Sequence, residues 1–331
     1  CESQGVFECR ECDGNGLWCQ ACTIELHQQH PCHRPHKWTG EHFMKISMES
    51  IGFVCHMDHG GKPCPYMRDD TGPQKLTIVD INGVHTVTIG WCRCANAPSF
   101  FNQLLRRRIL PASMKRPRTG FTFRVMRLFH LMNLIAHVTP WDFSSLLHRL
   151  TDNVDPTAIP NVYQTFNHVQ RQWRLVKAWK RGGVVNSFGP RAPGSLALHC
   201  VSCPMPGINL NADWESHPDS ELIHTVFIGG DGNFRLRRNN KGGGEKADPS
   251  LFGDDAFYAP NENYKVFCSC RGGAMDDQSD STCRGHRAGN SAVVVRSYNK
   301  PTSGIVSLSC GRTGAFMPQG MVDIKGGEKY V

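Results

Sequence analysis

Apolar residues follow two different patterns along the chain. Two runs rich in apolar and β-branched residues, 75–79 and 84–89, predict a pair of strands. Asn82 and Gly83 lie between these runs, and an Asn-Gly pair at this position is typical of a tight hairpin turn. Further along, the spacing of an amphipathic helix appears three times, and the last helix is expected to end at the glycine pair that follows it. These predicted helices cover residues 122–135, 141–150 and 161–181.

The last third of the chain has the pattern of short strands separated by loops. Residues 221–228 predict a strand, and Asp231 and Gly232 follow it as a pair that most often forms a turn. Shorter strands are predicted at 292–297 and 305–308, and residues 239–290 are expected to be loop or insertion.

These patterns divide the chain into four predicted units. A domain rich in Cys and His covers residues 1–98, and a helical region covers residues 99–181. Residues 182–220 are rich in Pro and Gly and are expected to be a linker that carries one more Cys pair. Residues 221–331 then form a unit that contains the predicted strands.

The composition is that of a globular chain, with 39% hydrophobic and 20% charged residues and a formal net charge of +8 over 331 residues. No run of apolar residues approaches the roughly 18 that a membrane-spanning helix needs. We therefore predict no membrane partner.

The chain has 16 cysteines, many of them in close pairs with histidines nearby, and this pattern indicates zinc. A pair of cysteines two residues apart turns two thiolates toward one tetrahedral ion. We favour a cross-brace of two zinc sites. One site would use Cys9, Cys12, His27 and His33, and the other would use Cys1, Cys19 and Cys22 with a fourth ligand that this chain lacks. A single all-cysteine site, or cysteines without metal, are the alternatives, and the rival ligands are His30, Cys32 and His36.

The later cysteines give weaker signals for metal. Cys92 and Cys94 are predicted to share one four-thiolate site with Cys200 and Cys203, against the alternative of unmetallated cysteines. A second, incomplete set consists of Cys283, His286 and Cys310, with Cys268 or Cys270. Buried or surface roles are expected for Cys55, His56, His59 and Cys64. None of these sets has the pattern of a catalytic zinc site, because no His-Glu-x-x-His motif is present.

The positive charge is concentrated in residues 101–181, which hold 14 Lys and Arg against three Asp, a formal charge of +11. Such a segment can neutralise phosphates, although charge alone does not separate DNA from RNA. The alternative is a solvated helix face without a ligand. The candidate DNA-contacting residues are Arg106, Arg107, Arg108, Lys115, Arg116, Arg118, Arg171, Arg174, Lys177 and Arg181.

A series of short motifs runs along nearly the whole chain. They include the two N-terminal Cys pairs with the histidines that follow, Arg171 to Arg174, Cys200 to Pro204, Asn209 and Leu210 with Trp214, and the segments 37–40, 61–65, 116–123, 231–236 and 326–330. In this order and spacing they resemble fungal transposases of the Kyakuja–Dileera–Zisupton (KDZ) family with their associated CxC-type cysteine cluster domain. The resemblance assigns residues 1–98 to the cysteine cluster domain and residues 221–331 to the N-terminal part of the transposase core.

The resemblance implies an RNase H-like core in which Asp231 is the first catalytic carboxylate. Carboxylates in such a core hold magnesium for attack on a phosphodiester. In the family the next catalytic Asp lies just beyond the stretch that matches 326–330, so this chain is expected to lack it and to be inactive alone. Asp323 is not assigned to catalysis. Thr313 stands where the family pattern has His, which weighs against a metal site around Cys283, His286 and Cys310.

The prediction is therefore a multidomain α+β chain with three parts: a small B-box-like cross-braced zinc module, a β-hairpin with a basic helical region, and an incomplete RNase H-like α/β core. Its function would be that of a nuclear DNA transposase fragment that binds transposon DNA, with structural zinc, and with magnesium in the complete enzyme. The alternative is a non-enzymatic, zinc-dependent module that binds DNA or protein, because a B-box commonly serves protein contacts.

Overall fold

The structure is a computed structural model, which describes residues 1, 3–14, 16–66, 72–183, 191–233, 236, 249–270, 302 and 304–324. The chain divides into two compact units, Cys1–Arg174 and Leu175–Val331, and each is described by itself. Within these residues, no helix has the length and apolar character needed to cross a membrane.

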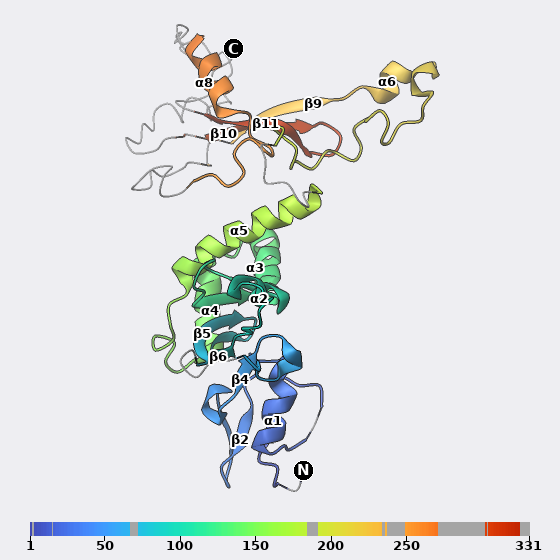
Figure 1. The fold of residues 1–331 in the computed structure, drawn as a ribbon. Helices are drawn as coiled ribbons and strands as arrows, with labels where there is room; N and C mark the ends of the chain where they lie inside the picture. Colours follow the sequence, from blue (N-terminus) through green and yellow to red (C-terminus); the bar gives the residue numbers. More distant parts are fainter. Residues whose placement is uncertain are drawn as a thin grey trace. The chain divides into compact units, whose positions relative to one another are not determined.

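The first unit starts with a small sheet next to a short helix (Figure 1). Strands β1 (Phe7–Glu8), β2 (His36–Trp38) and β3 (Phe43–Lys45) are antiparallel neighbours in that order. Helix α1 (Gln20–Leu26) is followed directly by the 3-10 turn η1 (His27–Gln29). Regular structure is short here, so side-chain contacts must hold this part together.

A five-stranded sheet forms the centre of the first unit, with the order β4-β6-β5-β8-β7. Strands β5 (Gln74–Asp80) and β6 (Gly83–Gly90) pair as an antiparallel hairpin, which confirms the two strands predicted from sequence. The two turn residues are Ile81 and Asn82, one position earlier than the predicted Asn-Gly pair, because Gly83 already pairs with Asp80. The hairpin is flanked by parallel neighbours on both sides, β4 (Val54–His56) next to β6 and β8 (Thr119–Thr122) next to β5. Strand β7 (Ile109–Pro111) pairs with β8 at the edge. The short turns η2 (Glu49–Ile51) and η3 (His59–Gly61) lie on either side of β4.

The three predicted helices are present at nearly the predicted bounds, and α2 (Phe100–Arg106) precedes them. They are α3 (Phe123–Ala136), α4 (Pro140–Thr151) and α5 (Tyr163–Arg181). The hydroxyl of Thr122 caps α3 by accepting the N–H of Val125, and Thr139 caps α4 in the same way. The region 99–181, predicted to be helical, also contains the strands β7 and β8, which lie between α2 and α3.

Two hydrophobic clusters fill the first unit. One joins Phe53, Ile78 and Ile89 of the sheet region to Leu104 of α2. The other is aromatic and buries Phe121, Phe129, Phe143 and Phe166 where α3, α4 and α5 meet the sheet. Asp80 is fully buried at the end of β5, where its carboxylate accepts hydrogen bonds from Thr122 and Arg124. The buried charge is therefore paired, as a low-dielectric interior requires.

In the second unit, the described residues contain one antiparallel sheet with the order β11-β10-β9. Its strands are β9 (Ile228–Asn233), β10 (Gly304–Cys310) and β11 (Phe316–Ile324). Strand β10 confirms the strand predicted at 305–308. The short helices η5 (Trp214–Ser216) and α6 (Ser220–His224) precede the sheet, and α8 (Asn261–Cys270) lies between β9 and β10 in sequence.

Three sequence predictions fail in this unit. Residues 221–227 are not strand, because Ser220–His224 form helix α6 and β9 begins only at Ile228. Asp231 and Gly232 do not form a turn, since both lie inside β9 and pair with β10. Helix α8 occupies part of the segment expected to be loop. The strand predicted at 292–297 and the motif at 326–330 lie outside the described residues.

Candidate metal centres and the basic surface

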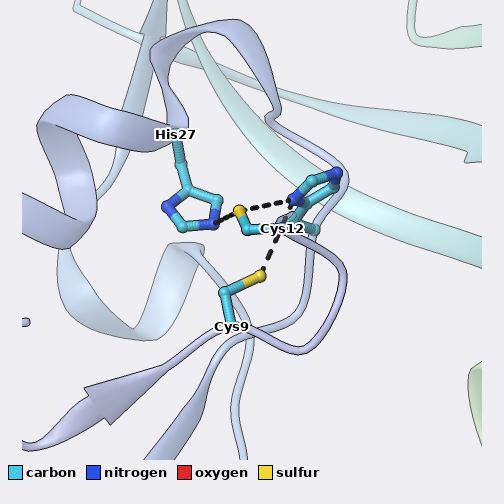
Figure 2. Close-up of side chains that lie close together, drawn as sticks. Cys9, Cys12 and His27 are labelled. Carbon is cyan, nitrogen blue, oxygen red and sulfur yellow. Dashed lines mark hydrogen bonds between the residues drawn. The ribbon is translucent and has the colours of Figure 1, made fainter. Parts of the chain in front are cut away.

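The first cluster of metal-binding side chains brings together Cys9, Cys12, His27 and His33. The two cysteines lie in the turn after β1, and the two histidines lie at the end of α1 and after η1. The Sγ of Cys12 is 3.5 Å from Nε2 of His27 and 3.4 Å from Nδ1 of His33, and the Sγ of Cys9 is 3.6 Å from the same Nδ1 (Figure 2). A tetrahedral zinc with Zn–S near 2.3 Å and Zn–N near 2.0 Å separates sulfur from nitrogen by about 3.5 Å. The donor set and its spacing therefore fit zinc.

The backbone fixes which nitrogen of His27 faces the thiolates. Its Nδ1 lies 2.7 Å from the carbonyl oxygen of Thr23, one turn earlier in α1, so Nδ1 carries the proton and donates it there. Nε2 is then left unprotonated on the side of Cys12. A metal-binding imidazole is commonly oriented by such a hydrogen bond through its other nitrogen.

Burial sets the protonation of this cluster. It raises the pKa of the Cys9 thiol to about 12 and lowers the pKa of the His27 and His33 imidazoles. Neutral imidazole is the form that binds a metal, so the two histidines are ready ligands. A buried thiol loses its proton when a cation supplies the compensating charge.

A second group near the N-terminus consists of Cys1, Cys19 and Cys22. Cys19 is the N-cap of α1 and its sulfur accepts the N–H of Cys22, while the Sγ of Cys1 lies 3.2 Å from that of Cys19. The two Cys pairs thus face different partners, and the two ligand groups alternate along the sequence. The rival ligands belong to neither group: Cys32 is buried in the core, the ring of His30 stacks on that of His33, and His36 lies in β2.

A third cluster consists of His59, Cys64, Cys92 and Cys94. The Nε2 of His59 lies 3.3 Å from the Sγ of Cys92 and 3.4 Å from that of Cys94, and the sulfurs of Cys64 and Cys94 are 3.9 Å apart. These separations also match the edges of a zinc tetrahedron. Hydrogen bonds favour the deprotonated form of one of these thiols, that of Cys64. Burial acts to raise the pKa of Cys64, but hydrogen bonds from the N–H groups of Arg93 and Tyr66 and from the side chains of Cys94 and His59 together outweigh it and lower that pKa to about 7.

Parallel pairing of β4 with β6 assembles the third cluster. His56 pairs with Gly90 at the ends of the two strands, so both chains leave the sheet at the same edge. The segment after β4 carries His59 and Cys64, and the segment after β6 carries Cys92 and Cys94. The sequence motif Cys92-x-Cys94 indicated half of this cluster, whereas His59 and Cys64 were expected to have buried or surface roles.

A fourth cluster, in the second unit, joins Cys200 and Cys203 to Cys310. The sequence predicted one four-thiolate site for Cys92, Cys94, Cys200 and Cys203, whereas the structure groups the first pair with His59 and Cys64 and the second pair with Cys310. Each pair finds ligands within its own unit, because chain turns that are invisible in the Cys spacing bring other side chains closer. Cys283 and His286 lie outside the described residues.

The candidate DNA-contacting residues differ in how far their side chains are exposed and in whether they bond to the rest of the protein. Arg107 donates hydrogen bonds to the side chain of Gln29 and the backbone of Gln28, and Arg174 donates to Asn133 at 2.7 Å, so both are tied to the protein. Arg106 lies 3.9 Å from the carboxylate of Asp58. The exposed members are Arg106, Arg108, Lys115, Arg116, Arg118, Lys177 and Arg181, whereas Arg171 is half-buried.

Lys115, Arg116 and Arg118 are close together in sequence, on the loop between β7 and β8. All three side chains are exposed. This short loop therefore carries the densest exposed positive charge among the candidates.

Asp231 lies in the middle of β9, opposite Ser307 of β10, and its side chain is exposed. Its Oδ1 accepts the N–H of Gly232 at 2.8 Å. Asp323 of β11 pairs with Ile305 of β10, and Asp231 pairs with Ser307 of the same strand. Ile305 and Ser307 are two residues apart, so their side chains and those of their partners lie on the same face of the sheet. The strand spacings place Asp323 two strands away from Asp231, at about 12 Å. In the parts of the chain that the structure describes, no group of three or more metal-binding side chains includes Asp231.

Comparison with known families gives two matches in separate parts of the chain. Residues 48–155 match the CxC2-like cysteine cluster associated with KDZ transposases. Residues 224–331 match the Kyakuja-Dileera-Zisupton transposase. These two matches support a KDZ family transposase. No curated protein and no solved structure matches it.

The two matches place the sites within the KDZ architecture. The cysteine-cluster match contains His59, Cys64, Cys92 and Cys94, and it begins after the N-terminal clusters. It also contains the basic loop between β7 and β8. The KDZ transposase match contains the whole described sheet of the second unit, including Asp231.

Proposed function

We propose that this KDZ-family chain binds DNA through its basic surface, is stabilised by structural zinc, and carries the first carboxylate of a magnesium-dependent nuclease core at Asp231. The observation that carries the proposal is the order of two family segments on one chain, a cysteine cluster followed by a transposase segment. DNA as the partner follows from that family, and the nucleus is where such a partner would be met.

Zinc is proposed at the clusters of the first unit. The first and third clusters each supply four ligand atoms of the kinds that structural zinc uses, at separations close to those of a tetrahedron. Regular structure is short around both. A bound ion would supply cross-links there in place of a larger hydrophobic core.

An antiparallel sheet with an exposed carboxylate on its first strand is compatible with the start of an RNase H-like core. Magnesium in such a core needs two or three carboxylates close together. Asp323 shares the face of Asp231 but lies two strands away, which is too far to bind the same ion. Within the described residues, no group of three or more metal-binding side chains includes Asp231, and we propose that the 331-residue chain alone does not cut DNA. Magnesium-dependent nicking that Asp231→Ala abolishes would contradict this.

DNA binding can be tested through its salt dependence. Replacing Lys115, Arg116 and Arg118 by Gln removes three exposed positive charges from one loop. If all three contact phosphates, the slope of log K against log salt concentration becomes less steep by about 2.7. A matched variant replaces Lys37, Lys62 and Arg149, which are exposed elsewhere, and changes the net charge equally.

Fluorescence anisotropy with a labelled duplex at several salt concentrations measures both slopes. We expect the loop variant to lose slope and the matched variant to keep it. Equal losses in the two variants would mean that the loop is not the contact surface, and that net charge alone governs binding.

The alternative function is a zinc-dependent module that contacts protein, without catalysis. The alternation of the first two ligand groups along the sequence favours it, because this is the arrangement of a B-box-like cross-brace. Binding of duplex DNA with no contribution from the loop, together with loss of a protein partner on Cys12→Ser, would favour this alternative.

A further inference from the structure

We propose that Cys200, Cys203 and Cys310 form a three-thiolate zinc centre whose fourth position, beside Thr313, is open to water or to an added imidazole or thiol. The proposal goes beyond the transposase function and does not depend on it.

Two turns of equal spacing face each other at this site. Cys200 and Cys203 are separated by two residues, and the N–H of Cys203 donates to the carbonyl of Cys200 at 3.2 Å. Cys310 ends β10 and is separated by the same two residues from Thr313, in a turn closed by the N–H of Gly314 on the carbonyl of Cys310 at 2.8 Å. Paired turns of this spacing supply four ligands to a structural zinc. Here the fourth place is taken by Thr313.

The distances agree with this assignment. The sulfurs of Cys203 and Cys310 are 3.6 Å apart, close to the roughly 3.8 Å edge of a tetrahedron with two Zn–S bonds. All three sulfurs lie within 4.8 Å of one another. The hydroxyl oxygen of Thr313 is 3.1 Å from the sulfur of Cys200, so it borders the thiolate group on the side that lacks a ligand. A disulfide would need about 2.05 Å between two sulfurs, so the three cysteines are free thiols.

Thr313 leaves the coordination shell incomplete. A neutral hydroxyl is not among the residues that structural zinc sites use, whereas thiolate, imidazole and carboxylate are. Cys200 and Cys310 are buried, but Thr313 is exposed, so solvent reaches the fourth position. A zinc ion here would therefore exchange faster than one held by four protein ligands, as at Cys9, Cys12, His27 and His33.

The site also has a place in the sheet. Cys310 pairs with Ile228, the first residue of β9, three residues before Asp231. On the other side, the side-chain amide of Asn209 donates to the carbonyl of Cys203 at 2.9 Å and braces the first turn. A metal ion would thus fasten the segment that precedes α6 to the end of β10.

Substitution of Thr313 tests the proposal in the full chain. Thr313→His and Thr313→Cys add the missing ligand, and Thr313→Val removes the hydroxyl without adding one. Zinc release to a colorimetric chelator is followed over time, with total zinc measured by mass spectrometry. In Thr313→His and Thr313→Cys, we expect one equivalent of zinc to be released at least tenfold more slowly than the same equivalent in the wild type. Thr313→Val should release its zinc at the wild-type rate. Cys203→Ser should lose one equivalent.

The remaining zinc of each variant serves as the control for folding, because the clusters of the first unit are untouched. If Thr313→His releases zinc as fast as Thr313→Val, or if Cys203→Ser keeps all of its zinc, the proposal is wrong. Intact-mass analysis after alkylation gives a further check, since a Cys203–Cys310 disulfide in protein purified under reducing conditions would also overturn it.

Discussion

The carboxylate of Glu11 accepts a hydrogen bond from the side-chain amide of Asn82, with 2.6 Å between Oε1 and Nδ2. Glu11 lies between two cysteines of the first cluster, and Asn82 is in the turn of the β5–β6 hairpin. The other oxygen of Glu11 accepts the backbone N–H of Arg34 at 2.7 Å. One side chain outside the candidate ligand set therefore connects the N-terminal Cys/His cluster to the central sheet.

We predict that Glu11 and Asn82 are energetically coupled. In a double-mutant cycle of Glu11→Ala and Asn82→Ala, followed by urea unfolding, the interaction energy should be about 1 kcal/mol, below the usual range for a charged hydrogen bond because the pair is exposed. Zinc content should be the same in all four proteins. Zero coupling would mean that the contact does not hold in solution, and zinc lost in Glu11→Ala alone would make Glu11 a ligand.

Arg34 is a second connection, and it is buried. Its guanidinium donates to the carbonyls of Asn82 and Leu150 at 3.0 Å each and to that of Val84 at 3.1 Å. Arg34→Met would leave three carbonyls without their donor, and we expect it to lower the free energy of unfolding by about 3 kcal/mol. Arg34→Lys should recover only part of the loss, since an ammonium lacks the planar fork.

Arg10 provides the matched control for Arg34. It is 59% exposed and its contact with Glu8 is 3.6 Å long, so Arg10→Met should cost less than about 0.5 kcal/mol. Equal losses for the Arg10 and Arg34 variants in guanidinium unfolding would contradict the bonding described for Arg34.

The first cluster makes a prediction about which cysteine binds zinc. Cys12→Ser should lower the zinc content by one equivalent and the thermal midpoint of unfolding with it. Cys32→Ala should keep all of its zinc, because Cys32 lies in the hydrophobic core. Metal analysis of the purified proteins measures this, and loss of zinc from the Cys32 variant would transfer the ligand role to it.

The third cluster permits a test with two neighbouring histidines. His59→Asn should lose one equivalent of zinc, since Nε2 of His59 lies within 3.4 Å of two thiols. His56→Asn should retain it, because His56 belongs to β4 and lies outside the cluster. The cobalt-substituted proteins give an independent readout, as the visible absorption of a tetrahedral site should fall only in the His59 variant. The reverse result would reassign the ligand.

The sequence pattern predicted those elements that are formed by contacts between residues close together in the chain. The β5–β6 hairpin follows from its two apolar runs and the Asn-Gly signal between them, and α3, α4 and α5 follow from their apolar spacing. The ligand groups near the N-terminus were also predictable as neighbours, because Cys9 through His33 are close in sequence and pairs two residues apart share a direction.

The features that sequence could not supply depend on contacts between distant segments. Parallel pairing of β4 with β6 has no local signature, and without it His59 and Cys64 have no reason to meet Cys92 and Cys94. The same holds for Cys310, which reaches Cys200 and Cys203 from more than 100 residues away. At Asp231, a local preference for a turn was outweighed by strand pairing with Ser307.

The position of the hairpin within its sheet has a consequence for the order of folding. The β5–β6 pair closes over a two-residue turn, so it can form within microseconds. Strand β4 precedes the hairpin in the sequence and β8 follows it, and both pair with it in parallel. Each of these pairings must first close a longer loop. We expect the hairpin to act as the nucleus onto which the earlier and later segments assemble, so that the ligands of the third cluster come together only late in folding.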